Sequence, residues 1–139
     1  MLVAAALLAV GLLGQLALLV SGLHTERAAA NLTTAVSLAA DLGERIRSNP
    51  SVALLYAIDS GAEPPATVHC AVATPADATT RAACDLDEWW REATATLPGM
   101  TAQVTTAVLP GTAATSCVIT IRWESQGSDG GRYTLRLRV

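Results

Sequence analysis

The sequence contains no lysine and no phenylalanine, and all nine of its basic residues are arginine. These arginines are scattered rather than gathered in a run, so the sequence gives no sign of a nucleic-acid site. It also lacks a phosphate loop, a nucleophile elbow, an HExxH pair and any CxxC spacing, which are common signatures of nucleotide, hydrolase and metal sites. We therefore predict no catalytic residue, no cofactor and no bound metal, and a protein that is not an enzyme.

Charge is also absent from the first 23 residues, which are apolar apart from Gln15, Ser21 and their glycines. At about 1.5 Å per residue, a helix of this length would span the hydrocarbon core of a bilayer. We interpret residues 1–23 as the transmembrane half of a long helix. A cleaved signal peptide is the alternative, but no arginine precedes the apolar run, and the run is longer than a usual h-region.

The helical pattern continues beyond this segment, and it predicts an amphipathic half over residues 24–49. Apolar residues at helical spacing should pack on the globular domain. This stripe consists of Leu32, Val36, Leu38, Ala39, Leu42, Gly43 and Ile46. Arg45 and Arg47 suit the negative end of the helix dipole, and Pro50 ends the helix because the residue before it is pushed out of the α region.

The rest of the chain, residues 50–139, is long enough for one small domain. Its predicted parts are a loop over residues 50–83, a short helix over residues 85–97 and an antiparallel sheet over residues 102–139. Asp85 and Glu88 have the spacing of a capping box, which makes Asp85 the expected N-cap. Two neighbouring residues cannot share one helical face, and we expect Trp90 rather than Trp89 in the core.

Three strands are predicted over residues 102–109, 116–124 and 132–139, because apolar and polar residues alternate along them. They should form a meander with one wet face and one dry face buried under the helices. The dry face is expected to hold Val104, Thr106, Val108, Cys117, Ile119, Ile121, Trp123, Tyr133, Leu135, Leu137 and Val139. The predicted fold class is therefore α+β.

Arginines occupy the wet face of this sheet. Arg132, Arg136 and Arg138 lie on the last strand, and Arg122 can join them from the strand beside it. They can bind an acidic partner surface or phosphate. The simpler interpretation is that they keep the sheet soluble and protect an edge strand from pairing.

An odd number of cysteines leaves one without a partner. Cys70 and Cys84 bracket a span of loop-forming residues, and a disulfide between them would add about 3 kcal/mol by restricting the unfolded chain. Cys117 alternates with apolar residues, so we expect a buried free thiol, although the other pairings stay open. His69 beside Cys70 does not make a metal site, because further ligands are missing.

Two motifs at a distance from each other carry a family resemblance. The opening MLVAAALLAVGLLG and the later GERIRSNP over residues 43–50, followed by Tyr56, resemble the type IV pilus modification protein PilV family of minor pilins. Further similarities lie at Cys84, Trp90, residues 97–99 and residues 118–123. The resemblance therefore covers nearly the whole chain.

The resemblance implies a type IV pilin-like fold, with a long N-terminal helix packed on a small antiparallel sheet. It implies a minor pilin that takes part in pilus assembly or priming by helix packing. Its partners would be other minor and major pilins, the inner membrane and the assembly platform. The domain would lie outside the cytoplasm, later in the pilus or at the cell surface. Gly11 and Gly14 would let neighbouring helices approach closely.

One feature of the family is missing from the sequence. A prepilin peptidase site and a glutamate would lie immediately before Met1, so we expect an upstream start codon or a natural start that precedes this chain. A pseudopilin of a type II secretion system is an alternative with the same architecture. A membrane-anchored binding module whose arginines engage a ligand such as DNA is another, although nucleic acid as a partner lacks support in the sequence. A secreted domain is the third.

Overall fold

The computed structural model describes residues 2–64, 70, 77–125 and 130–139, without the side chains of residues 2 and 4–10. Its elements are α1 (Leu2–Ser48), the 3-10 helix η1 (Pro50–Tyr56), α2 (Ala78–Thr96), β1 (Thr101–Val108), β2 (Thr115–Trp123) and β3 (Gly131–Arg138). The predicted α+β class is confirmed, because long and short helices accompany a three-stranded antiparallel sheet. Each strand begins one residue earlier than predicted.

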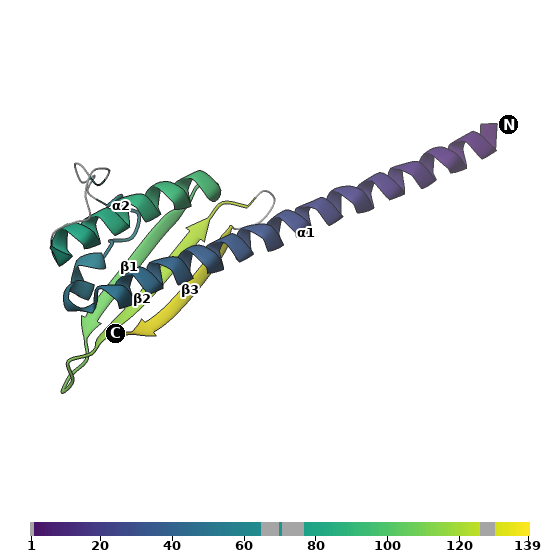
Figure 1. Cartoon of the computed structure of the whole chain (residues 1–139). Helices are drawn as coiled ribbons and strands as arrows, with labels where there is room; N and C mark the ends of the chain where they lie inside the picture. Colours follow the sequence, from purple (N-terminus) through teal and green to yellow (C-terminus); the bar gives the residue numbers. More distant parts are fainter. Residues whose placement is uncertain (1, 65–69, 71–76, 126–129) are drawn as a thin grey trace.

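The helix α1 is continuous over 47 residues and extends far beyond the domain (Figure 1). It ends before Pro50, as predicted, and Asn49 leaves the helical region with φ −133°. The expected stripe is wrong at its start, because Leu32 and Val36 are 45% and 39% exposed. The helix turns a neighbouring face toward the domain, and the buried stripe consists of Ala35, Leu38, Ala39, Leu42, Gly43 and Ile46.

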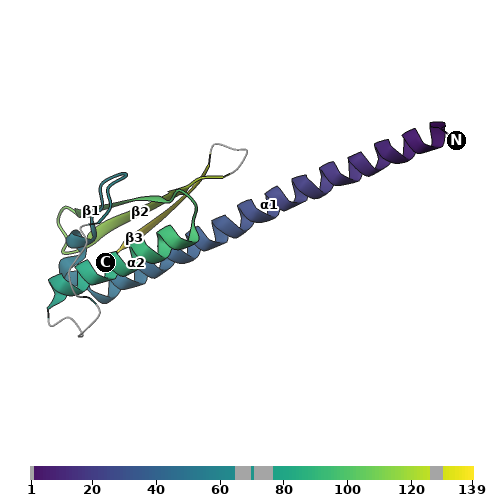
Figure 2. The same cartoon turned by 90° about the horizontal axis from the view of Figure 1, so that it is seen from above.

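The sheet has the order β1-β2-β3 with antiparallel neighbours, which confirms the predicted meander. Both helices cover the same face of the sheet (Figure 2). The second half of α1 lies over β3 and β2, while α2 packs beside α1 and against η1. Figure 1 shows α2 along the β1 side of the domain and β3 along the other side.

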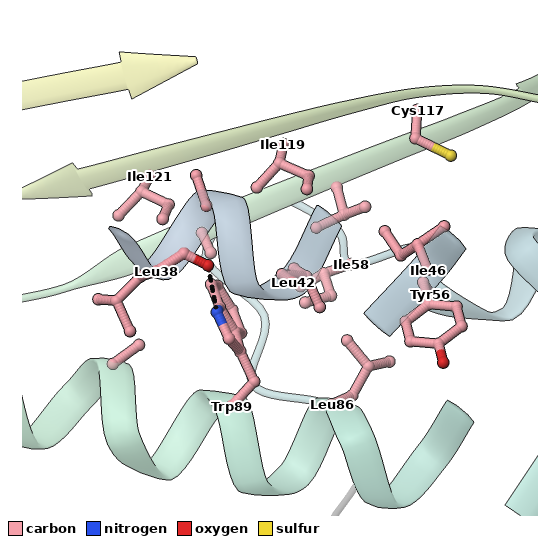
Figure 3. Packing of buried hydrophobic residues seen from close by; sticks show 14 of the residues in the cluster. Leu38, Leu42, Ile46, Tyr56, Ile58, Leu86, Trp89, Cys117, Ile119 and Ile121 are labelled. Carbon is pink, nitrogen blue, oxygen red and sulfur yellow. Dashed lines mark hydrogen bonds between the residues drawn. The ribbon is translucent and has the colours of Figure 1, made fainter. Parts of the chain in front are cut away.

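The core fills the space between the helices and the dry face of the sheet (Figure 3). The predicted dry-face residues that are buried are Val104, Cys117, Ile119, Ile121, Trp123 and Leu137. Tyr133, Leu135 and Val139 are partly buried against them. Val108 is 56% exposed, contrary to prediction, because the turn between β1 and β2 extends past the helices (Figure 1).

The start of α2 differs most from the prediction. The helix begins at Ala78, and its N-cap is Asp77 rather than Asp85. Asp77 Oδ1 accepts a hydrogen bond of 2.8 Å from the backbone N–H of Thr80. The predicted loop over residues 50–83 is therefore wrong in part, since it includes η1 and the first turns of α2. The threonines there are modest helix formers, which concealed a segment that is also held by the buried Ala82.

The two neighbouring tryptophans exchange their predicted roles. Trp89 is fully buried, and its indole N–H donates a hydrogen bond of 2.8 Å to the carbonyl of Leu38 (Figure 3). Trp90 is only partly buried. The longer α2 is phased so that its buried residues recur at helical spacing, namely Ala82, Leu86, Trp89 and Ala93. This face excludes Trp90.

Candidate functional site

The first half of α1 exposes large apolar side chains to solvent. Among its described side chains, none that precedes Ala35 is buried. The exposed fraction of the residue is more than half at Val3, Leu12, Leu13, Leu16, Leu18, Leu19, Val20 and Leu23. A continuous apolar surface of this kind marks a site of contact with another molecule. We call this set the apolar segment.

Gly11 and Gly14 lie within the apolar segment. A Cβ atom at either position would meet nothing within 4 Å. Packing within the described part of the chain therefore requires neither glycine. Their role in close helix packing stays a prediction about neighbouring subunits.

The apolar segment overlaps the predicted transmembrane half of α1. No helix among the residues available for description is both long and apolar enough to cross a membrane. The predicted span over residues 1–23 includes residues 1, 2 and 4–10, whose side chains are outside that description. It therefore stays a prediction.

The other end of α1 is joined to α2 by charged side chains. The guanidinium of Arg45 donates hydrogen bonds of 2.8 Å to Asp41 and to Glu88 of α2, and it lies 3.7 Å from Asp85. Burial alone would lower the pKa of Arg45, but these hydrogen bonds outweigh it and raise the pKa above its ordinary value. The same hydrogen bond lowers the pKa of Glu88. Arg45 thus stays charged and bound to α2.

A buried tyrosine extends this connection. Tyr56 is fully buried, and its hydroxyl donates a hydrogen bond of 2.6 Å to Asp85. Burial, and then the hydrogen bond to Asp85, raises the pKa of Tyr56 to about 12. The side-chain amide of Asn49 donates to the Tyr56 hydroxyl at 3.5 Å and to the carbonyl of Ala78 at 2.8 Å. We call Asp41, Arg45, Asn49, Tyr56, Asp85 and Glu88 the polar junction.

The polar junction was not predicted from the sequence. The sequence pattern relates Arg45 to the helix dipole, and Asp85 and Glu88 to a capping box. The spacing of Asp41 and Arg45 signalled the ion pair within α1, but nothing local indicates the partners on α2. The side chains of the junction bind one another, which fits a structural connection between α1 and α2 rather than chemistry on a substrate.

The structure places the four predicted arginines on the exposed face of the sheet, on β2 and β3. Arg122 lies directly opposite Arg132, Arg136 opposite Val118, and Arg138 opposite Ser116. Within the described ranges, none of these four arginines forms an ion pair with a carboxylate. We call Arg122, Arg132, Arg136 and Arg138 the arginine face. That it binds a partner stays a prediction.

The predicted disulfide between Cys70 and Cys84 is present, with its Cα atoms 5.4 Å apart. Cys117 is a buried free thiol, as expected, and burial raises its pKa. His69 lies outside the described residues. Among the residues that the structure describes, no three histidine, cysteine or acidic side chains lie close enough together to hold a metal ion.

Comparisons of this chain with protein-family models, with curated proteins and with solved structures gave no match.

Proposed function

We propose that this protein is a minor pilin, which takes part in type IV pilus assembly or priming by packing its long helix against other subunits. The observation that carries the proposal is the apolar segment, which belongs to the same helix as the buried stripe of the domain. One half of α1 packs within the chain and the other half has no cover in the part of the chain described.

The physical argument concerns what covers the apolar segment. Each fully exposed leucine or valine gains about 1.5–3 kcal/mol when it is removed from water, so the segment requires lipid or other helices. We propose that it lies in the inner membrane before assembly and then among the helices of other minor and major pilins. The domain would lie outside the cytoplasm and form the outer part of the assembly.

The polar junction supports the same function. It attaches the end of α1 to α2 and η1 through residues of the GERIRSNP motif and through Tyr56. A subunit that assembles by its helix needs the helix fixed to its domain. These residues lie at positions where the sequence resembles the minor pilin family, and here they make this attachment.

The test combines a deletion strain with matched variants in the native host. Deletion of the gene should reduce surface pili, and the full chain should co-precipitate with other pilins. Leu16→Arg/Leu19→Arg should abolish both the restoration of surface pili and the co-precipitation with other pilins, because charge in the apolar segment opposes burial in lipid or among helices. The control Leu54→Arg/Leu55→Arg makes the same change at half-exposed leucines of η1 and should act like the wild type.

Normal pili in the deletion strain, or no association with any other pilin, would overturn the proposal. A secreted form that lacks the apolar segment, shown by sequencing the mature N-terminus, would contradict it as well.

A further inference from the structure

The arginine face carries four positive charges on one surface of a small sheet. Arg122 and Arg132 lie directly opposite each other on β2 and β3, and like charges in this position destabilise a sheet. Their neighbours on the exposed face are neutral, such as Thr120 and Thr134, whose hydroxyl oxygens are 3.2 Å apart. An acidic surface from another molecule would relieve this repulsion.

The same chain carries an acidic surface on its other side. In the polar junction three carboxylates, those of Asp41, Asp85 and Glu88, surround the one guanidinium of Arg45. Glu88 remains 65% exposed on its side chain. Glu92, one turn further along α2, is exposed and forms no ion pair within the described ranges. Arg91, which lies between them, is paired with Asp87, so the exposed surface of α2 around Glu88 and Glu92 keeps a net negative charge.

These two surfaces lie on opposite sides of the domain, since α2 covers one face of the sheet and the arginines occupy the other. Figure 1 shows α2 along the β1 side and β3, which holds three of the four arginines, along the other side. A contact between two different surfaces of identical subunits is heterologous, and it can repeat from one copy to the next. The arginines stand on the sheet face that the helices leave uncovered, so with the copies stacked and their α1 helices pointing the same way, the arginine face of one meets the α2 surface of the next.

We propose that the arginine face binds the acidic α2 surface of a second copy of this chain. The contact deepens the proposed function and rests on it, because it supplies a domain-to-domain contact between subunits whose helices pack together. A nucleic acid is the less favoured occupant. The whole chain has a formal net charge of −3, which opposes a polyanion at long range, and the aromatic residues of β2 and β3, Trp123 and Tyr133, belong to the core side.

The test uses the full chain in detergent micelles, with association measured by sedimentation. Arg136→Glu/Arg138→Glu and Glu92→Arg/Ala95→Arg each reverse one surface at exposed positions and leave the polar junction intact. Each variant alone should associate more weakly than the wild type by about tenfold or more. An equimolar mixture of the two should regain association, because reversed surfaces then face each other. The wild type should weaken from about 0.1 M to about 1 M salt, since the Debye length shortens from about 10 Å to about 3 Å.

The matched control is Arg27→Glu/Arg47→Glu, which makes the same charge change at exposed arginines of α1, outside both surfaces, and it should associate like the wild type. A wild type that stays monomeric, or two variants that associate as strongly as the wild type, would overturn the contact. A duplex DNA probe that binds the wild type and not Arg136→Glu/Arg138→Glu, without self-association, would overturn it in favour of nucleic acid. The pilus count of the deletion strain decides the proposed function separately.

Discussion

At the scale of single residues, Tyr56 connects parts of the chain that are distant in sequence. Its ring is buried in the core, while its hydroxyl meets Asp85 of α2 and Asn49 at the end of α1. Asn49 in turn donates to the carbonyl of Ala78, the first residue of α2. One hydroxyl group and one amide therefore fix how the long helix meets its domain.

Replacing this tyrosine tests the connection. Tyr56→Phe should lower the free energy of unfolding by about 1.5–3 kcal/mol, the usual contribution of a hydrogen bond to a charged group. The folded pKa of about 12 lies above the ordinary value of 10.0, so this contribution is fully present below pH 10 and is lost as the pH rises toward 12. Denaturant unfolding at neutral and alkaline pH measures it. If the free energies of unfolding of the wild type and Tyr56→Phe differ by the same amount at neutral and at alkaline pH, the hydrogen bond from Tyr56 to Asp85 does not make this contribution.

The tryptophan pair gives a second test at single residues. Trp89→Ala should destabilise the protein by about 3–5 kcal/mol, because it leaves a cavity and removes the hydrogen bond to Leu38. Trp90→Ala should lower the free energy of unfolding clearly less than Trp89→Ala does, since Trp90 is only partly buried. Thermal unfolding of both variants provides the comparison. Equal losses in the two variants would show that the structure assigns the core residue wrongly.

At the scale of elements, the start of α2 depends on its cap. Hydrogen bonds from the backbone and the side chain of Thr80 lower the pKa of Asp77 below its ordinary value of 3.8. The cap therefore stabilises the helix above pH 3.8, and its contribution is lost as the pH falls through the lower folded value. Asp77→Ala should reduce stability at neutral pH, and Asp77→Asn should not, because asparagine caps equally well.

Circular dichroism of thermal unfolding measures this effect. On acidification, the stability of the wild type should fall toward that of Asp77→Ala. The stability of Asp77→Asn should keep the contribution of its cap. If the wild type is more stable than Asp77→Ala by the same margin in acid as at neutral pH, the carboxylate is not the cap.

Elements with a strong local pattern could be predicted from the sequence. Strand β2 alternates regularly, so its buried Ile119 and Ile121 were identified, and Pro50 gave the end of α1. The start of α2 could not be predicted, because it contains few apolar residues and Asp85 offered a plausible later cap. The polar junction could not be predicted either, since Arg45 and Glu88 are 43 residues apart. Only the fold brings them together.

At the scale of the whole molecule, the domain and the apolar segment have separate roles. The core lies entirely between the second half of α1, the shorter helices and the sheet. The apolar segment adds nothing to this core in the side chains described. Changes in it should therefore alter assembly without altering the stability of the domain, which is why Leu54 and Leu55 provide an informative comparison for Leu16 and Leu19.

The length of α1 makes the polar junction a pivot. About 43 residues of α1 precede Arg45, and at about 1.5 Å each they form an arm of about 65 Å. A tilt of about 10° at the junction would displace the tip of this arm by about 11 Å, comparable with the usual distance of about 8–10 Å between two packed helix axes. A small change of angle where Arg45 and Tyr56 meet α2 would thus move the N-terminal end of α1 by about the spacing between neighbouring helices.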